Sequence, residues 1–356
     1  MRHKFTLTIL CLAVSYFTVN AKVWTVDNNA GASADYSVLQ NAIDKASAGD
    51  TLYVTGSPNY YDGSTMVRLN KKLILIGPGF FLGENSNTQS SNQTAKIYSM
   101  EIGEGADNSL IMGLDFYSSS REILFSKDKR DGSVGSSPAN NVVIKRNLIE
   151  SLDLNYASGT VIEQNYFYNN GNNVHLDNTC SNTLIQNNIM NSGSSYYATI
   201  YGDSNYELSN TVVKNNTLSN GLYRIHAVEI SNNIFITGTL NDCDKNTVKN
   251  NVFVSAEEAI PTESTANVLN KNIFSVTASE LFVEATQTVD NDYILSTDSP
   301  AKGAGIDGID AGAFGGLNPY KLSGLSPIPS IYELTTNGIG TLEEGIKVTI
   351  KAKSNN

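Results

Sequence analysis

The chain contains few cysteines, few histidines and few cations, and each shortage excludes a class of protein. Its 356 residues include three cysteines, three histidines and 24 Lys and Arg against 35 Asp and Glu, a formal net charge of −11. A negative field repels nucleic acid and anionic lipid, so we expect neither as a partner. It also gives no general attraction for acidic polysaccharides, which would need a local basic site or a bridging cation. Motifs of classical nucleophiles, phosphate loops and zinc sites are absent as well.

Long apolar runs are also missing, except at the N-terminus. There a basic start, residues 2–4, precedes the apolar residues 5–17 and a small-residue cleavage site at 19–21. This order is typical of a signal peptide, and the run is too short to span a bilayer. We therefore predict a signal peptide over residues 1–21, no transmembrane segment, and a secreted or periplasmic protein, with the cell surface as a further location.

A repeated seven-residue frame predicts the fold. The frame has two apolar β-formers, two polar residues, an asparagine and two more apolar or aromatic residues. Its copies are centred on Asn147, Asn165, Asn188, Asn216, Asn233, Asn251 and Asn272. The intervals between these asparagines are 18, 23, 28, 17, 18 and 21, a mean near 21. A constant frame with variable intervals is typical of a solenoid, in which strands and one tight corner superpose while loops differ.

Asparagine suits a tight corner for two reasons. It tolerates left-handed backbone angles, and its amide can donate to one coil and accept from the next, forming a ladder. The alternative is that asparagine is simply common in this chain, but seven recurrences in one apolar frame disfavour it. On this stacking Cys180 and Cys243 lie about three coils apart, roughly 14 Å at ~4.8 Å per strand, so we predict two unpaired, buried thiols.

Both ends of such a stack need covers, because an open coil exposes unpaired strand edges. At the front, Asp35 or Ser37 can cap a short helix with one apolar stripe, which comprises Leu39, Ala42, Ile43 and Ala46. At the back, a glycine-rich stretch at 303–316 predicts a tight closing wrap. Residues 317–330 are Pro-rich and predict a linker, and residues 331–356 predict a β hairpin.

Several segments resemble the pectate-lyase-like superfamily of right-handed parallel β-helices. They are Gly49-Asp50-Thr51-Leu52-Tyr53-Val54, Leu75-Ile76-Gly77-Pro78-Gly79, the asparagine-cornered coils and Ser299-Pro300-Ala301. The likeness covers about residues 22–316 and implies an all-β, right-handed parallel β-helix with an N-terminal capping helix. It leaves activity open, because the superfamily includes polysaccharide lyases, glycoside hydrolases, epimerases, phage tailspikes and adhesins.

Alternation along the predicted coils assigns side chains to one exposed sheet. Leu152 and Leu154 should point inward, so Asp153 and Asn155 point outward. The same rule places Tyr223 and Ile225 inside. The predicted outward rows are Asp153, His175, Thr199 and Arg224 in one, and Asn155, Asp177, Tyr201 and His226 in the other. Asn241 is predicted outside one coil later, and Asp203 lies just beyond Tyr201.

This face predicts a polar groove for a sugar chain. The candidate proton-transferring residues are His175, Tyr201, Arg224 and His226, and the candidate substrate-binding residues are Asn155, Thr199, Asp203 and Asn241. Asp153 and Asp177 are candidate ligands for a Ca²⁺ ion that would neutralise a uronate carboxylate. β-Elimination needs such parts: charge neutralisation, a base for the C5 proton and an acid for the leaving oxygen. The alternative is that an exposed strand face is polar in any case and holds two histidines by chance.

Three functions therefore stay open. The first is a polysaccharide lyase acting on a uronate-containing glycan, the second a non-catalytic glycan-binding or adhesin-like β-helix, and the third a purely architectural rod. The paired acids of the pectinase-type hydrolases, the Lys and Arg pair of the lyases and the Asp-Pro-His-Asp motif of alginate epimerases are all missing, which leaves catalysis undecided. The charged loop at 127–133, with Arg130 and Asp131, is a weaker candidate site. We expect a monomer whose partner is a polysaccharide or cell-surface glycan.

Overall fold

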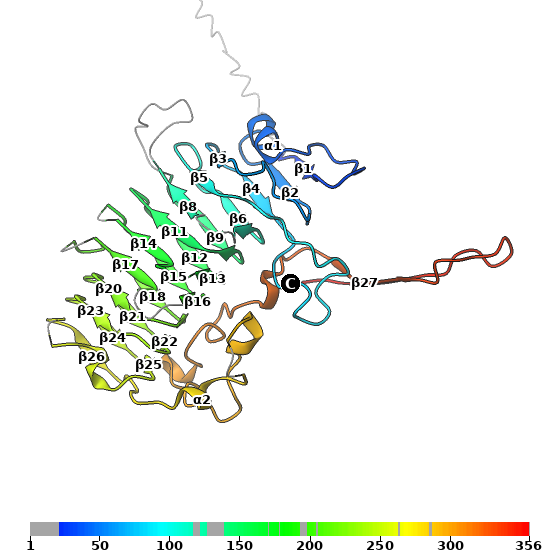
Figure 1. Cartoon of the computed structure of the whole chain (residues 1–356). Coiled ribbons are helices and arrows are strands. Elements are labelled where there is room, and N and C mark those ends of the chain that lie inside the picture. Colours follow the sequence, from blue (N-terminus) through cyan, green and yellow to red (C-terminus); the bar gives the residue numbers. More distant parts are fainter. Residues whose placement is uncertain are drawn as a thin grey trace, which may run out of the picture.

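The computed structural model shows a parallel β-helix, as the repeat predicts (Figure 1). It describes residues 21–116, 122–126, 139–169, 171–177, 179–192, 198–203, 206–262, 264–284 and 287–355. Most of the predicted signal peptide and the whole charged loop at 127–133 lie outside these ranges. No helix in the described ranges is long and apolar enough to cross a membrane.

Three parallel sheets run along the described part of the helix. Sheet 1 comprises β1 (Val23–Val26), β2 (Thr51–Val54), β4 (Ile74–Ile76), β6 (Leu110–Met112), β9 (Val143–Lys145), β12 (Val161–Glu163), β15 (Leu184–Gln186), β18 (Val212–Lys214), β21 (Glu229–Ser231), β24 (Thr247–Lys249) and β26 (Val268–Asn270). Sheet 2 comprises β7 (Asp115–Phe116), β10 (Leu148–Ile149), β13 (Tyr166–Asn169), β16 (Ile189–Ser192), β19 (Thr217–Leu218), β22 (Ile234–Phe235) and β25 (Val252–Phe253). Sheet 3 comprises β3 (Val67–Leu69), β5 (Met100–Ile102), β8 (Glu122–Phe125), β11 (Ser151–Leu154), β14 (Val174–Leu176), β17 (Ile200–Gly202), β20 (Leu222–Tyr223) and β23 (Leu240–Asn241).

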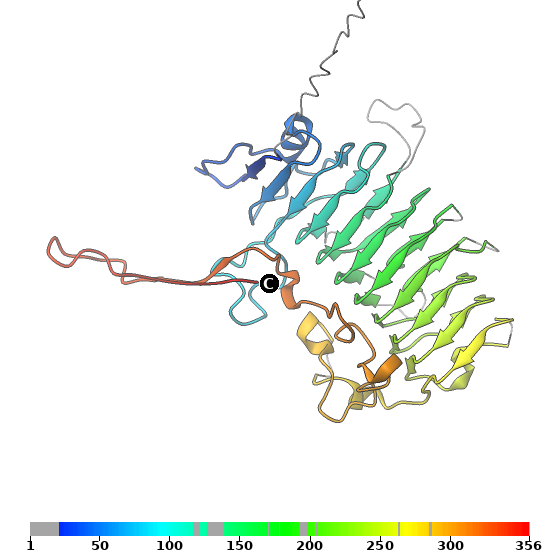
Figure 2. The ribbon, with the colours of Figure 1, turned by 180° about the vertical axis from the view of Figure 1, so that it is seen from behind.

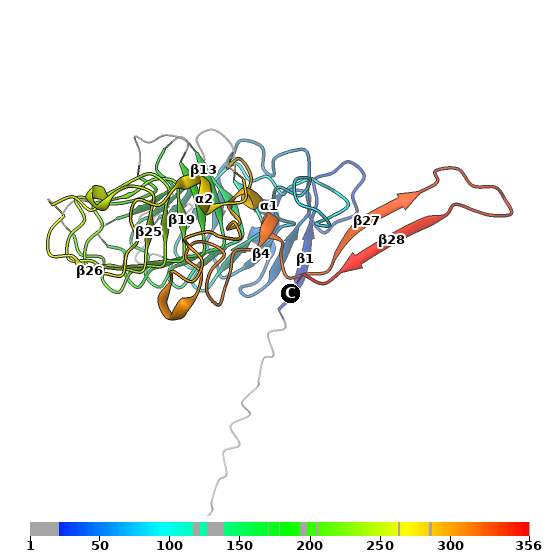
Figure 3. The ribbon, with the colours of Figure 1, turned by 90° about the horizontal axis from the view of Figure 1, so that it is seen from below.

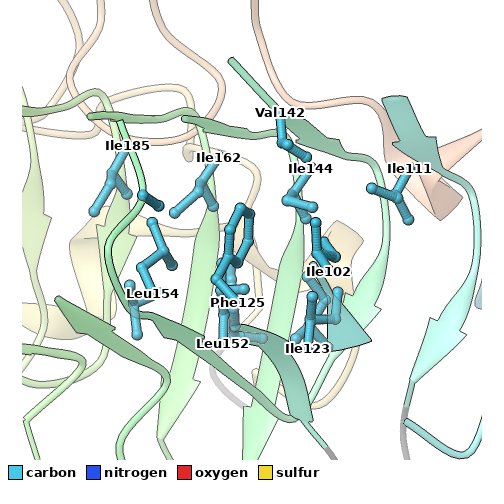
Figure 4. Packing of buried hydrophobic residues seen from close by; sticks show 14 of the residues in the cluster. Ile102, Ile111, Ile123, Phe125, Val142, Ile144, Leu152, Leu154, Ile162 and Ile185 are labelled. Atoms are coloured by element: carbon cyan, nitrogen blue, oxygen red, sulfur yellow. The ribbon is translucent and has the colours of Figure 1, made fainter. Parts of the chain in front are cut away.

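The core consists of apolar side chains stacked in register inside the coils. Ile144 pairs with Ile162, and Ile162 pairs with Ile185, so each branched side chain lies over its equivalent in the next coil. Figure 4 shows these residues of sheet 1 facing Leu152 and Leu154 of sheet 3. All five are at most 1% exposed. Each coil therefore buries its apolar side chains against its neighbours. Because each coil needs only these neighbours, the β-helix can be larger than the usual single domain.

The asparagine ladder is present along the corner between sheets 1 and 2. The side-chain Nδ2 of Asn147 donates to Oδ1 of Asn165 at 3.1 Å, and the next five steps, each 3.0 Å, connect Asn165, Asn188, Asn216, Asn233, Asn251 and Asn272. Each of these amides also donates to a backbone carbonyl of a neighbouring coil, as Asn188 does to Ile162 at 2.8 Å. The buried amides therefore have their hydrogen bonds made, which removes the cost of burying them.

One detail of the corner differs from the prediction. The left-handed residue is not the ladder asparagine but the residue before it. These preceding residues, with φ between 52° and 58°, are Arg146, Gln164, Asn187, Asn215, Asn232, Asn250 and Lys271. A left-handed residue turns the chain sharply, and the asparagine that follows then points its amide into the stack.

The first coils are covered by the predicted helix, α1 (Leu39–Lys45). Its stripe Leu39, Ala42 and Ile43 is fully buried, as expected. The predicted cap is wrong, because Asp35 accepts hydrogen bonds from Thr25 instead. The N-terminal N–H groups of the helix donate to the carboxylate of Asp62, at 3.0 Å from Leu39 N and 3.2 Å from Gln40 N.

After the last coil the chain runs back along the outside of the helix. The short helices α2 (Ala278–Leu281) and η2 (Asp290–Tyr293) precede this return, and η1 (Glu257–Ala259) lies in an earlier turn. We call residues 304–326 the return segment; it contains η3 (Ile306–Gly308) and η4 (Leu322–Gly324). Figure 2 shows it in orange beside the coils.

The return segment binds the left-handed corner residues one after another. Asn250 donates to Ala304 O at 3.0 Å, Asn187 to Ala313 O at 2.9 Å, and Arg146 to Leu325 O at 2.8 Å. The expected closing wrap at 303–316 is thus part of a strap along the corner, and residues 317–330 are not a free linker. Gly315 is required there, because a Cβ would lie 1.9 Å from Asp310 O.

The C-terminus forms the predicted hairpin from β27 (Ser330–Thr336) and β28 (Val348–Lys353). It projects away from the coils as an arm (Figure 3). Leu334 pairs with Ile350, and the two side chains are 55% and 58% exposed. The return segment brings this arm to the end of the helix that carries the first coils.

The two cysteines after the predicted signal peptide are free and buried, as predicted. Burial raises the pKa of the Cys180 thiol and of the Cys243 thiol to about 12. Both therefore stay protonated and unreactive in the core.

Candidate functional site

The candidate site lies on the outer face of sheet 3. One residue of each described strand of this sheet falls in a single register row: Arg68, Glu101, Leu124, Asp153, His175, Tyr201, Tyr223 and Asn241. Neighbouring positions such as Leu152 and Leu176 point into the core. Because successive side chains of a strand face opposite ways, the row lies along the outer surface.

His175 is held between two carboxylates. Its Nδ1 is 2.7 Å from Oδ1 of Asp153, and its Nε2 is 3.2 Å from Oδ1 of Asp203. Its ring stacks on the ring of Tyr201 at a centroid distance of 4.3 Å and an angle of 12°. Both ring nitrogens donate only in the imidazolium form, so this arrangement stabilises the charged histidine.

The pKa of His175 is raised above its ordinary value of 6.5. Burial, the largest effect, lowers this pKa, but the hydrogen bonds and charges of Asp153 and Asp203 together outweigh it. The side chain of His175 is 16% exposed, against 45% for Asp203. The His175 ring therefore lies near the surface, beside a carboxylate that solvent reaches.

Next to His175 the sheet carries a groove of about 540 Å³. It crosses four successive coils, and its lining comprises Asn172, Ala198, Tyr201, Gly202, Asp203, Asn220, Gly221, Leu222, Tyr223, Arg224, Gly238, Thr239 and Asn241. Tyr201 and Tyr223 are register partners on adjacent strands, and Tyr223 is 38% exposed. The two rings therefore stand on the same side of the sheet, one coil apart.

Glycines allow a close approach of two coils at the groove. A Cβ on Gly221 would lie 1.7 Å from Thr239 O, and one on Gly238 would lie 1.8 Å from Gly221 N. The two backbones thus approach more closely than any other residue permits. Both glycines line the groove, so neither adds a side chain to its surface.

Arg224 lies at the edge of the groove, at the turn that ends β20. Its φ is 55°, a left-handed conformation. The guanidinium lies 4.7 Å from the centroid of the Tyr223 ring, and Nε donates to Oδ2 of Asp242 at 3.3 Å. Arg224 is therefore near the surface as predicted, but beside the row instead of in it.

The predicted register is wrong from Thr199 onward. His175 pairs with Tyr201, not with Thr199, and Thr199 is fully buried, with Oγ1 donating to Gly221 O at 2.9 Å. Tyr223 was expected inside and is exposed. The reason is local: the turn at Arg224 interrupts the alternation, so that Ile225 points inward again.

His226, expected on the outer face, is only 4% exposed. Its Nδ1 accepts a hydrogen bond from Asp244 N at 3.1 Å, and its buried Nε2 has no hydrogen-bond partner. It belongs to the coil corner that follows Arg224, where its backbone pairs with that of Glu207 in an isolated parallel β-bridge. The structure therefore places it away from the groove.

The remaining predicted site residues are divided between the groove and its margins. Asp203 and Asn241 line the groove. Asn155 donates through Nδ2 to Asp153 at 3.2 Å, so it supports the carboxylate that holds His175. Asp177 stabilises a turn, accepting from Thr179 N at 2.7 Å.

The two predicted calcium ligands do not combine into a cation site. Asp153 and Asp177 are not register partners, and each carboxylate is bound by protein donors. In the ranges that the structure describes, no three His, Cys, Asp or Glu side chains are grouped to hold a metal. Ca²⁺ takes six to eight oxygen ligands, so the donors present do not fit it.

Sequence reasoning missed Tyr223, Asp242 and the three glycines of the groove. One signal for Tyr223 was available, because it follows Tyr201 by 22 residues, close to the mean coil length. Asp242 and the glycines carry no such signal, since their roles depend on contacts between coils.

No protein-family profile and no curated protein sequence matches the chain. Among solved structures, a mutant of a PL6-family alginate lyase is similar at 18% identity and a TM-score of 0.43, over 68% of this chain and 38% of that one. ORF18 of Geobacillus virus E2 is 12% identical, with a TM-score of 0.32 over 71% and 60% of the two chains. XylC in complex with xylose is 13% identical, with a TM-score of 0.26 over 68% and 55%. The chain spans less than two thirds of each, and likenesses of this strength carry no functional conclusion.

Proposed function

We propose that this protein binds a polysaccharide along the outer face of sheet 3, in the groove over Tyr201 and Tyr223. The observation that carries the proposal is the pair of tyrosines on adjacent coils, in a groove that Gly221 and Gly238 also line. Aromatic rings offer apolar area with a polar tip, which suits the mixed surface of a sugar ring. Amide, hydroxyl and phenol groups beside them supply hydrogen bonds that orient a ligand.

The row geometry also supports an extended ligand. Coils of a β-helix repeat at about 4.8 Å, so side chains of one register row present similar groups at regular intervals. A polymer of repeating sugars lying along the helix axis would meet His175, Tyr201 and Tyr223 in turn. A single small molecule would use only a part of such a row.

Binding to immobilised or gel-embedded polysaccharides tests this function. The chain without residues 1–21 should be retarded by at least one polymer. Tyr201→Ala should weaken that binding about tenfold, the effect of removing a contact of ~1.4 kcal/mol. Retardation by no polymer, with a folded protein by circular dichroism, would contradict the proposal.

A second candidate is a polysaccharide lyase that acts on a uronate-containing glycan. Arg224 at the groove and Tyr201 next to His175 favour it, because β-elimination needs a cation at the carboxylate and groups that move protons. The raised pKa of His175 favours the role of proton donor to the leaving oxygen over that of the base. Incubation with uronate polymers, with and without Ca²⁺, should then yield an unsaturated product that absorbs in the ultraviolet. Glycan binding without this product would exclude the lyase.

We also propose that the chain is exported and acts as a monomer, as its sequence suggests. Mass spectrometry of the secreted or periplasmic form should find Lys22 as the first residue. Light scattering should give the mass of one chain. A retained N-terminus in the cytoplasm, or a stable dimer, would contradict these two expectations separately.

A further inference from the structure

The charged side chains around the groove are already matched with opposite charges from the same face. Arg224 donates to Asp242, and His175 lies between Asp153 and Asp203. Three carboxylates thus surround one guanidinium and one imidazole. The local charge is −1 when His175 is protonated and −2 when it is neutral.

The rest of the lining is neutral. Of the thirteen described residues that line the groove, only Asp203 and Arg224 carry a charge, and these two have opposite signs. Thr239 and Asn241 supply a hydroxyl and an amide, and the two tyrosines supply phenols. Such groups donate to and accept from sugar hydroxyls without requiring a charge on the sugar.

We infer that the groove selects neutral glycans over polyuronates, an inference that rests on the proposed function. A uronate carboxylate that approaches Arg224 meets a guanidinium whose charge is already largely neutralised by Asp242, whose Oδ2 is 3.3 Å from Nε. It would also enter beside Asp203, a like charge that repels it. A neutral sugar chain avoids both costs and still contacts the rings of Tyr201 and Tyr223.

A bridging cation does not change this expectation. The carboxylate of Asp153 is committed to His175 and Asn155, and that of Asp177 to the turn at Thr179. In the part of the chain that the structure describes, no three His, Cys, Asp or Glu side chains are grouped to hold a metal ion. Selectivity should therefore persist when Ca²⁺ is added.

A binding panel tests the selectivity. The chain without residues 1–21 is titrated with neutral polymers (galactomannan, xyloglucan, arabinoxylan, mixed-linkage glucan) and with polyuronates (alginate, polygalacturonate). Titrations are run at about 20 mM and about 150 mM NaCl, where charge screening differs, each with and without Ca²⁺. At least one neutral polymer should bind with a Kd that changes less than about twofold with salt, and each polyuronate should bind about tenfold more weakly or worse.

The local origin of the selectivity is tested with a matched pair of variants. Asp242→Asn removes a carboxylate beside the groove and releases Arg224, so polyuronate affinity should rise about threefold or more. Glu333→Gln removes the same charge from an exposed ion pair on the distant arm, where Glu333 lies 2.7 Å from Lys351. This control should leave polyuronate affinity within about twofold.

Each outcome decides one claim. A polyuronate that binds as tightly as the best neutral polymer overturns the selectivity and leaves glycan binding intact. An equal rise in both variants shows that overall charge, not the groove, sets the preference, which overturns the local explanation. If no polymer of either kind binds, the proposed function fails and this inference with it.

Discussion

Asn188 donates through Nδ2 to Oδ1 of Asn216 at 3.0 Å, although 28 residues of chain separate the two. The same amide donates to Ile162 O at 2.8 Å, and its Oδ1 accepts from Asn165. One side chain therefore connects three coils inside a fully buried corner. The ladder fixes the register of the coils on both sides, and the outward row of sheet 3 depends on that register.

Replacing Asn188 with Leu should lower the free energy of unfolding by about 1–3 kcal/mol, because the donors and acceptors of neighbouring coils would be left buried without partners. Asn70→Leu is the matched control, since Asn70 is exposed and its backbone is not left-handed. Chemical denaturation measures both. A loss below about 0.5 kcal/mol for Asn188→Leu would show that the ladder adds little to stability.

The return segment should be released by a single change at the corner. Asn187 donates to both Ala313 O and Gly315 O, at 2.9 and 2.7 Å. Asn187→Asp keeps the shape and the tolerance of a left-handed backbone, but turns the donor into a charged acceptor facing two carbonyls. Hydrogen exchange of residues 304–320 should then accelerate at least tenfold, about 1.4 kcal/mol of local stability, while the amides of sheet 1 stay protected. Unchanged exchange would mean that other contacts hold the segment.

Much of the fold could be predicted because a buried amide needs the same surroundings in every coil. The apolar frame around each asparagine located seven corners, and the structure confirms all of them. The cap of α1 and the path of the return segment could not be predicted in this way. Asp62 lies 23 residues from the helix start it caps, and Asn187 lies 126 residues from Ala313. Local patterns contain no information on such partners.

The site was predicted only as far as its strands remain regular. Asp153, His175 and Tyr201 were correctly placed outside, because β11, β14 and β17 keep simple alternation. The prediction fails at Thr199, whose hydroxyl is buried at a corner, and at Tyr223, which precedes the left-handed turn at Arg224. The outward residue is Tyr201 instead of Thr199, two positions later, and Tyr223 instead of Arg224, one position earlier. A shift of one residue exchanges inward and outward side chains, which is why Tyr223 was assigned to the wrong face, whereas a shift of two residues keeps the face.

The raised pKa of His175 makes part of the stability depend on pH. Because the pKa in the folded state lies above the ordinary 6.5, its contribution is complete below that value and is lost as pH rises through the folded pKa. His175→Gln should therefore cost more stability near pH 5.5 than near pH 9, about the ends of the titration range. Thermal unfolding of both proteins at the two pH values measures this. A difference that is equal at both, or larger near pH 9, would contradict the imidazolium arrangement.

Tyr223 should contribute to glycan binding more than an equally exposed tyrosine elsewhere. Tyr223 and Tyr168 are 38% and 39% exposed, but Tyr168 lies on sheet 2, away from the groove. Tyr223→Ala should weaken binding of the best polymer about tenfold, and Tyr168→Ala less than about twofold, because only the first removes a ring from the groove. Equal losses would show that the polymer does not use the groove.

Hydrogen exchange with a bound oligosaccharide tests most directly whether sheet 3 is the glycan-binding surface. Addition of a saturating fragment of the best polymer should slow exchange in peptides that cover β17, β20 and β23, which line the groove. Peptides from sheet 1, the return segment and the arm should be unchanged. Protection confined to any of those other regions, with binding confirmed by titration, would contradict the proposed surface.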